Sequence, residues 1–264
     1  MKANKERYFV NAVWIIGVFL LWEGVAFLLA NVLKDPMAST KLPYFHEVVI
    51  TIINNASELL VAAGLTFSRA LIGYALGAVI GFLLAILMSL SRTVEKIAFP
   101  YLIISQMIPV LGLAPIIFSL VKDMDASRIV IAAYITFFPV AVNMLEGLLS
   151  VENDRKELMY SLAAKKWSIY FKLMIPASLP NLFSGLKISA PMAVTASILV
   201  DMLGSSGGIG VKLLYSLYSG TKDIFWASVI TSAVMGLISY FVVAILEKIC
   251  TPWNQGAKQK EGVD

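Results

Sequence analysis

Residues 157–180 read ELMYSLAAKKWSIYFKLMIPASLP, a charged, helix-forming segment between two hydrophobic stretches. A connection between adjacent membrane spans needs only a handful of residues, so a polar segment of this length serves another purpose. No Gly or Pro occurs between Asp154 and Trp167, and Asp154 and Glu157 are acidic residues of the kind that a helix N-terminus favours. We therefore expect a short helix that stops before Pro176 and offers its surface to a partner protein.

The composition places the chain in a lipid bilayer. Hydrophobic residues make up 59% of the 264 residues and charged residues 14%, whereas soluble domains contain roughly 45–50% apolar residues. The net charge of +4 fits basic cytoplasmic loops better than nucleic-acid binding. A single cysteine, Cys250, and a single histidine, His46, exclude a disulfide framework, a metal site built on either residue and a Ser/His/Asp or Cys/His catalytic set.

Six hydrophobic stretches are long enough to cross the hydrocarbon core, which takes about 20 apolar residues. They are residues 10–33, 71–90, 97–121, 128–150, 182–203 and 224–249. The first is longer than the apolar region of a cleavable signal peptide and is interpreted as a retained anchor. The predicted fold class is therefore an all-α membrane protein with six transmembrane helices.

The basic residues predict the orientation of the chain. Cytoplasmic loops carry an excess of Lys and Arg, and most of the 21 such residues lie in segments that share a side with the N-terminus. These segments are 2–7, 92–96, 155–172 and 248–260. Six spans bring both termini to one side, and the charge bias predicts that this side is the cytoplasm.

Two segments on the outer side are predicted to be structured. Residues 34–69 carry apolar residues at helical spacing, which favours a helix lying on the outer surface or entering from it. Those apolar residues are Val48, Ile52, Ala56, Leu59 and Ala63. Residues 204–223 match neither phosphate-binding glycine motif and predict a tight re-entry turn with a short amphipathic stretch. The polar tail 254–264 is predicted to be disordered.

Prolines interrupt three predicted spans near the middle of the bilayer. Pro109, Pro139 and Pro191 each remove a backbone hydrogen bond where lipid cannot replace it. The three helices therefore either surround a pathway near the midplane or carry ordinary proline kinks. Polar groups at membrane depth usually face inward, and the candidates to line a pathway are Gln106, Pro109, Asn143, Thr195, Ser197 and Asp201.

Three charged residues lie within predicted spans. Asp201 is close to the outer end of its stretch, where it either faces the pathway or caps the turn at Gly204. Lys187 is expected to extend its ammonium toward the cytoplasmic headgroups, and Glu23 is expected to pair within the bundle.

Small residues stand beside basic and aromatic ones within the 157–180 segment. Ala163 and Ala164 precede Lys165, Lys166 and Trp167, a combination suited to laying a helix into the groove of a partner. The same lysines and tryptophan suit an amphipathic helix that rests on anionic headgroups. The residue types alone favour neither interpretation.

The spacing of this segment resembles the signature loop of ABC importer permeases, which reads E-A-A, three residues, G, nine residues and then I-x-L-P. Glu157 takes the acidic position and Ala163 the glycine position, and the remaining positions are taken by Leu158, Met159, Leu173, Ile175 and Pro176. The resemblance assigns contact with an ATPase to Glu157, Ala163, Ala164, Lys165, Lys166 and Trp167.

The resemblance extends over roughly residues 43–253. The matching stretches are QMIPVLGLAPIIF (106–118), IPASLPNLFSGLKIS (175–189), DMLGSSGGIG (201–210) and LEKICTPW (246–253). They are similar to permeases of the nitrate, sulfonate, taurine and bicarbonate branch, and permeases for pyrimidine precursors of thiamine look much the same. Relatives commonly carry glutamate at the position of Asp201.

The resemblance implies one transmembrane permease domain over residues 1–264 of the type I (MetI-like) kind, with its core at 43–253, a coupling segment at 154–180 and both termini cytoplasmic. It implies a multi-pass protein of the bacterial cytoplasmic (inner) membrane that is not itself an enzyme. Two copies of the chain would form the pathway, two copies of a separate ATPase would dock beneath them, and an extracytoplasmic substrate-binding protein would deliver the solute. ATP and Mg would bind the ATPase, because this chain has no Walker motif; the chain itself is expected to hold no cofactor.

The resemblance further implies that a small polar solute, nitrate-, sulfonate-, taurine- or pyrimidine-like, moves inward by alternating access. An ion-coupled secondary transporter or channel is the alternative, and it predicts inverted repeats and intramembrane ion ligands. The sequence has no convincing internal repeat and few, scattered acidic residues. A small oxyanion, a sulfonate and a heterocycle all remain open as the solute.

Overall fold

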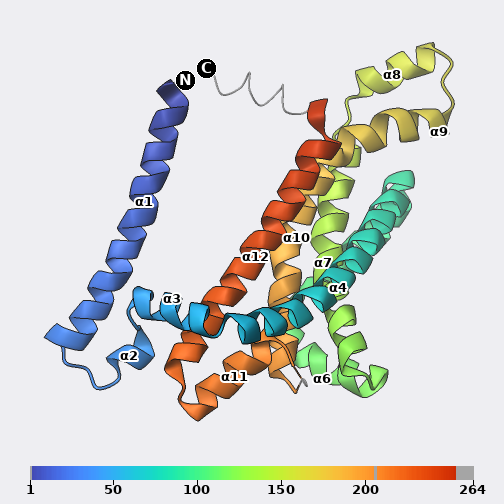
Figure 1. Ribbon diagram of the computed structural model, residues 1–264. Helices are drawn as coiled ribbons and strands as arrows, with labels where there is room; N and C mark the ends of the chain where they lie inside the picture. Colours follow the sequence, from blue (N-terminus) through green and yellow to red (C-terminus); the bar gives the residue numbers. More distant parts are fainter. Residues whose placement is uncertain (1, 205–206, 254–264) are drawn as a thin grey trace.

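The structure, a computed structural model, describes residues 2–204 and 207–253. Among these residues the regular elements are all helical, as the sequence predicts (Figure 1). In chain order they are α1 (Lys2–Phe27), η1 (Leu28–Val32), α2 (Ala38–Lys41), α3 (Phe45–Asn54), α4 (Ala56–Leu90), α5 (Arg92–Met107), α6 (Val110–Val121), α7 (Met124–Leu149), α8 (Asn153–Ser161), α9 (Lys166–Ile169), η2 (Tyr170–Met174), α10 (Ile175–Met202), α11 (Ile209–Ser219) and α12 (Lys222–Cys250). The π-helical turns η1 and η2 continue neighbouring α-helices. The tail 254–264, predicted to be disordered, lies outside the described residues.

Several helices of the described chain can cross a bilayer. Four are long and apolar enough: α4, α7, the continuous helix Lys166–Met202 and α12. The pair α5 and α6 counts as a fifth only if two helices bent by 98° form one span. Near the start of the chain the apolar helical part is the shorter stretch Ile16–Val32. The all-α membrane class is confirmed, and the number of six spans stays a prediction.

The predicted third span, 97–121, is wrong as a single straight helix. It is two helices, α5 and α6, that meet at Ile108 and Pro109 at an angle of 98°. Both residues have extended backbone angles, with ψ of 119° at Ile108 and 125° at Pro109. Proline disfavours the helical conformation in the residue before it, so the chain leaves the helix there and restarts at Val110.

The predicted division between an outer helix at 34–69 and a span at 71–90 is also wrong. α3 ends at Asn54, and α4 then runs without a break through 35 residues. No proline interrupts this stretch, and one continuous face of small side chains packs it against the protein. The expected periodicity is nevertheless present, because Val48, Leu59 and Ala63 are buried.

Small residues set how closely the central helices approach. Gly73, Gly77 and Gly81 lie four residues apart on the face of α4 that meets α7. A Cβ on Gly77 would lie 2.5 Å from the carbonyl oxygen of Ala133, so only glycine permits this crossing. Gly185 of α10 approaches α7 in the same way, because a Cβ on it would lie 2.6 Å from the carbonyl oxygen of Pro139. Close backbone approach through small residues is a usual way to pack helices in lipid, and it makes α4, α7 and α10 one packed core.

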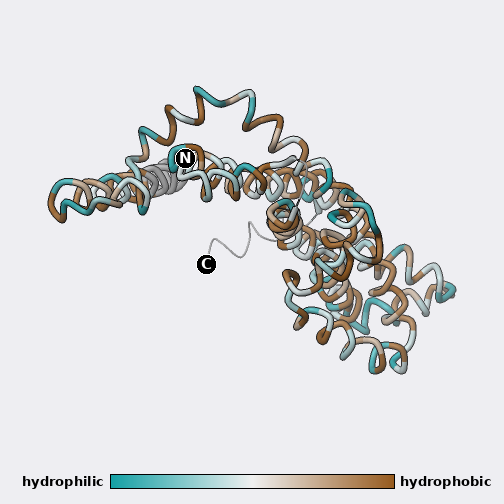
Figure 2. Tube along the Cα trace, turned by 90° about the horizontal axis from the view of Figure 1, so that it is seen from below, coloured by the Kyte–Doolittle hydropathy of each residue, from teal (hydrophilic) through white to brown (hydrophobic). Residues whose placement is uncertain are grey.

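The helix α1 stands apart from this core over most of its length (Figure 1). It is attached at its outer end, where Trp22 donates from Nε1 to the carbonyl of Pro43 at 2.9 Å and its ring contacts those of Phe45 and Trp226. Viewed from below, the chain spreads along a curved band instead of closing into a round bundle (Figure 2). The apolar side chains of α1 from Ile16 onward are largely exposed in a single copy of the chain.

The two ends of the molecule carry different segments. The start of α1, the end of α12 and the pair α8–α9 lie at one end, and α2, α6 and α11 lie at the other (Figure 1). The start of the chain and 154–180 thus lie at the end opposite 34–55 and 209–223, which are parts of the predicted outer segments 34–69 and 204–223. That both termini are cytoplasmic stays a prediction.

Candidate coupling and pathway sites

The candidate coupling segment consists of two short helices, α8 and α9, joined by a turn, and not of one helix. We call residues 153–169 the elbow. The predicted continuous helix from Asp154 to Trp167 is wrong, because α8 ends at Ser161 and α9 begins only at Lys166. Ala163 has a left-handed backbone with φ of 55°. The amide of Ala163 donates to the carbonyl of Tyr160 at 2.9 Å, and the amide of Ala164 donates to that of Met159 at 3.0 Å. This pair of bonds is the Schellman motif, which terminates a helix and is usually occupied by glycine at the left-handed position.

The second half of the elbow continues into the membrane. The prediction that the helix stops before Pro176 is wrong, because α9, η2 and α10 form one helical path from Lys166 to Met202. Pro176 lies in the first turn of α10, directly after the wide π-turn. Pro176 is thus inside the helical path, and it is tolerated there because the π-turn before it already departs from the regular α-helical hydrogen-bond pattern.

The elbow presents both charged and apolar side chains to its surroundings. The predicted coupling residues Glu157, Ala163, Lys165, Lys166 and Trp167 are all exposed, and Ala164 is half-buried. Leu158 and Leu162 are also exposed, the latter to 71%, although they lie outside the long apolar helices. Apolar side chains gathered on a polar segment mark an interaction surface.

The elbow is fixed to the core at its base. Ile169 and Tyr170 are buried, and the hydroxyl of Tyr170 is hydrogen-bonded to Ser89 near the end of α4. Trp167 stacks on Phe171 at a ring distance of 5.9 Å. The surface of the elbow is therefore held at a set position relative to α4 and α10.

The predicted pathway residues do not form one cluster in a single copy. Pro109 is exposed at the α5–α6 break, and Gln106 is half-buried one turn earlier. Asn143 lies against Gly185, where α7 crosses α10. Thr195 is exposed on α10, and its hydroxyl donates to the carbonyl of Pro191 at 3.0 Å.

The remaining two pathway candidates face protein. Ser197 is fully buried, and Asp201 is 1% exposed at the outer end of α10. The Nε atom of Arg128, a buried side chain of α7, lies 3.1 Å from Oδ1 of Asp201. The hydroxyl of Thr66 in α4 donates to Oδ2 of Asp201 at 2.5 Å. Asp201 therefore faces protein, and its carboxylate also accepts from the backbone N–H of Gly210, in the glycine-rich stretch that begins at Gly204, as the expected capping role requires.

The sequence interpretation missed Arg128 and Thr66. It assigned Arg128 to an outer loop boundary, but α7 begins at Met124 and carries Arg128 inward, where it is 1% exposed. The available signal was that a basic and an acidic residue each stand at the outer end of an apolar stretch. Threonine gave no such signal, because its hydroxyl usually bonds to its own helix.

Two other charged residues form pairs. Lys187 does not extend to the headgroups as expected; its Nζ lies 2.6 Å from Oε2 of Glu247 in α12, with both side chains less than one-fifth exposed. The protein pairs the charge locally because an ammonium at membrane depth needs a counter-ion. Glu23 pairs as predicted, with Nδ1 of His46 at 3.0 Å.

The geometry describes a membrane-embedded core with a rigid elbow at one end. Comparison with protein families shows which family the chain belongs to. Residues 77–249 match the family described as the binding-protein-dependent transport system inner membrane component. The chain belongs to this family of ABC importer permeases. It is a multi-pass membrane protein, it is not an enzyme, and its family works with a separate ATPase and a substrate-binding protein.

Similar proteins span nearly the whole permease. The formylaminopyrimidine transport permease protein ThiX of Halalkalibacterium halodurans is 30% identical over 246 residues, which cover 92% of this permease and 94% of that protein. The putative aliphatic sulfonates transport permease protein SsuC of Bacillus subtilis is 28% identical, with 96% and 91% covered. The nitrate import permease protein NrtB of Synechococcus elongatus is 25% identical, with 84% and 81% covered.

Solved structures show the same fold. A chain from an amino acid ABC transporter with histidines aligns with a TM-score of 0.61 at 16% identity, covering 77% of this permease and 97% of that chain. A chain from an inward-facing MetNI methionine ABC transporter aligns with a TM-score of 0.60 at 19% identity, covering 74% and 97%. The MetI-like fold is therefore confirmed, while the identities carry no information on the solute.

Proposed function

We propose that two copies of this permease form a pathway that carries a small polar solute inward by alternating access. Two ATPase subunits hold ATP and Mg and grip the elbow formed by α8 and α9 on the cytoplasmic side. An extracytoplasmic binding protein delivers the solute to the opposite end. The observation that carries this proposal is the elbow, which projects from the core with an exposed apolar surface and a fixed base.

The proposal of a second copy is supported by the surface of a single chain. The apolar side of α1 is largely exposed, and α1 contacts the rest of the described chain mainly at its outer end. On α10, the residues Ile188, Met192 and Thr195 form an exposed stripe at helical spacing. A second copy facing this stripe would enclose a pathway that one copy leaves open, and lipid would cover the remaining apolar surface.

The solute is proposed from the relatives and from the exposed stripe. The relatives are described as permeases for formylaminopyrimidine, aliphatic sulfonates and nitrate, which are all small polar molecules. The stripe on α10 is uncharged, so we expect selection among such solutes to reside in the binding protein. Ion-coupled transport is not favoured, since the buried carboxylate of Asp201 and the half-buried carboxylate of Glu247 are each paired with a cation.

The test of this function is binding of the ATPase by the elbow. We expect the detergent-solubilised wild-type permease to co-purify with its ATPase, and Leu162→Asp to weaken that binding by about tenfold or more, as for an interface hot spot. The matched control is Tyr218→Asp, which changes a side chain that is 83% exposed at the opposite end of the molecule. Equal binding of the ATPase by Leu162→Asp and wild type would contradict this role and favour contact of the elbow with lipid headgroups instead.

A further inference from the structure

The outer end of α10 carries a carboxylate that is enclosed by three other helices. Oδ2 of Asp201 accepts a hydrogen bond from the hydroxyl of Thr66 at 2.5 Å, and the backbone N–H of Gly210 also donates to this carboxylate. The hydroxyl oxygen of Thr66 accepts in turn from the amide of Ile209 at 2.9 Å. The N-terminus of α11 is therefore bound to α10 and α4 through one acidic side chain.

The glycines before α11 fit this carboxylate. Gly208 has φ of 121°, and a Cβ on it would overlap Oδ2 of Asp201. A Cβ on Gly210 would lie 2.6 Å from Cβ of Asp201. The glycine-rich turn thus lets the backbone close around Asp201, which supplies the negative charge that a helix N-terminus attracts. This explains the glycine pattern without any phosphate ligand.

A series of ion pairs links the carboxylate of Asp201 to α7. Nε of Arg128 lies 3.1 Å from Oδ1 of Asp201, and Nη1 of Arg128 lies 2.6 Å from Oδ1 of Asp125. Arg69 of α4 reaches Asp125 as well, at 2.9 Å. The contact between Nε of Arg128 and Oδ1 of Asp201 is an ion pair without hydrogen-bond geometry, and Nη2 of Arg128 and Nη1 of Arg69 are likewise buried without a hydrogen-bond partner among the described residues. Removing one member of such a buried pair leaves an uncompensated charge, which is strongly unfavourable.

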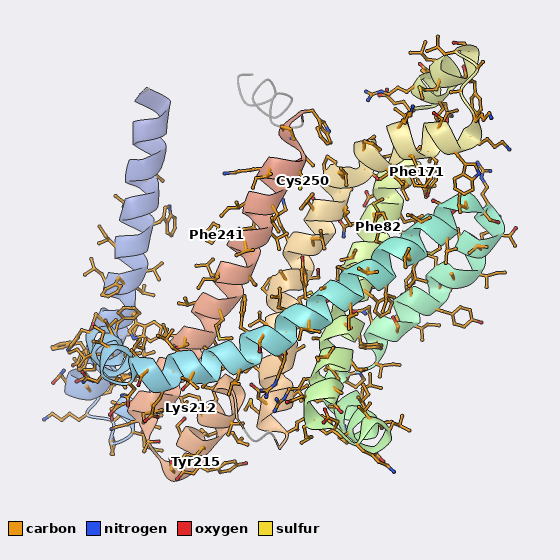
Figure 3. All side chains as sticks on the ribbon, turned by 45° about the vertical axis from the view of Figure 1, so that its right-hand side comes forward. Phe82, Phe171, Lys212, Tyr215, Phe241 and Cys250 are labelled. Carbon is orange, nitrogen blue, oxygen red and sulfur yellow. The ribbon has the colours of Figure 1, made fainter. Side chains whose placement is uncertain are left out.

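The far side of α11 is open to a partner. Tyr215, Leu217 and Tyr218 are exposed on it, and Tyr215 projects from the lower end of the molecule, opposite Phe171 (Figure 3). At the other end, α7 leads into α8 and α10 continues from α9. The packed helices α4, α7 and α10 therefore connect α11 to the elbow.

We propose that Asp201 is a positioning residue that holds α11 to α4, α7 and α10, so that contact of the binding protein with α11 reaches the elbow. We call this group of Thr66, Arg128, Asp201 and the 208–210 backbone the outer clasp. The signalling part of the proposal rests on the proposed function above, whereas the clasp itself can be tested in the permease alone.

The first experiment measures amide hydrogen exchange in the purified permease. Asp201→Asn should raise exchange in the 209–219 segment by about tenfold or more, because a local opening becomes easier, with a smaller rise in α7 and α10, since Arg128 keeps Asp125 as a counter-ion. Gly208→Ala should do the same while leaving every charge in place, and Asp201→Glu should restore most of the protection. The matched control is Glu58→Gln, which breaks the exposed Glu58–Lys212 pair that also joins α4 to α11 at 2.7 Å.

Three results would overturn the clasp. They are unchanged exchange in both Asp201→Asn and Gly208→Ala, an equal rise in Glu58→Gln, and a rise that spreads equally over α7 and α10, which would indicate general loss of stability. None of these readings depends on an ATPase or a solute.

The second experiment uses the complete complex in nanodiscs. In Gly208→Ala we expect basal ATP hydrolysis within about twofold of wild type and stimulation by the loaded binding protein reduced by about fivefold or more, on the scale of typical coupling energies. Stimulation equal to wild type, or a parallel loss of basal and stimulated rates, would overturn the role in signalling. A wild-type complex that fails to bind its ATPase would instead contradict the proposed function, and the exchange results would still decide the clasp.

Discussion

At the scale of single residues, Ala163 shows how a sequence motif can have a backbone cause. The signature loop that this segment resembles has glycine at this position, and the structure places Ala163 at φ of 55° in a Schellman motif. A left-handed conformation costs an L-residue with a Cβ about 1–2 kcal/mol, whereas glycine adopts it freely. The glycine preference therefore follows from the turn between α8 and α9.

Ala163→Gly should accordingly stabilise the elbow. We expect the free energy of unfolding of the α8 segment to rise by about 1 kcal/mol, measured by amide exchange of residues 153–162. The control is Ala164→Gly, one position later, where φ is not positive and glycine should stabilise nothing. Equal effects of the two substitutions would show that the turn is not the cause.

Thr195 is the residue through which the pathway can be tested. Its hydroxyl is already bonded to the carbonyl of Pro191, so Thr195→Ala should lose only about 1 kcal/mol of hydrogen-bond energy and transport almost normally. Thr195→Phe should block uptake by filling volume between two copies. Uptake by reconstituted complexes measures both, with Leu237→Phe on an exposed part of α12 as the control. Normal uptake by Thr195→Phe in a fully assembled complex would place the pathway elsewhere.

At the scale of the elements, the packing of α4 on α7 depends on glycines at a spacing of four. These residues allow backbone contact, which replaces the hydrophobic driving force that lipid does not provide. The consequence is a rigid unit that spans the molecule from the outer clasp to the elbow.

Gly77→Ala should disrupt this packing. The added methyl would meet the carbonyl oxygen of Ala133, and we expect a loss of about 1–3 kcal/mol from overpacking, measured by unfolding in detergent. Gly64→Ala in the same helix is the control, since no described atom lies within 4 Å of its added Cβ. There the change should be neutral or stabilising by about 0.5–1 kcal/mol. A loss of similar size at both positions would show that the contact of Gly77 with Ala133 is not the cause.

At the scale of the whole molecule, the grouping of segments at two ends predicts their sidedness. With Cys250→Ser as background, a cysteine replacing Tyr218 should react with an impermeant thiol reagent on intact cells, and one replacing Lys165 should react only after lysis. Both positions are exposed, so access to the reagent depends on the side of the membrane alone. Labelling of the Lys165 position from outside would invert the topology.

The sequence by itself determined the class of this protein, because burial of apolar side chains in lipid depends on composition and span length, which are local properties. It also predicted the helical periodicity of the outer segment at Val48 and Leu59 and an exposed polar segment around Glu157, because charge and apolar spacing can be read from a single chain. The coupling role of that segment stays a prediction. The family assignment followed from motif spacing.

Only the tertiary structure decided where helices break and which charges meet. The chain bends by 98° at Pro109, whereas a helix continues through Pro176. The two prolines differ in effect because the residue before Pro109 is extended and the residue before Pro176 is helical. The pairing of Arg128 with Asp201, and of Lys187 with Glu247, joins residues more than 55 positions apart. A buried charge needs a partner, but the sequence does not state which one; the approach of α10 to α7, permitted by Gly185, and its packing against α12 make that choice.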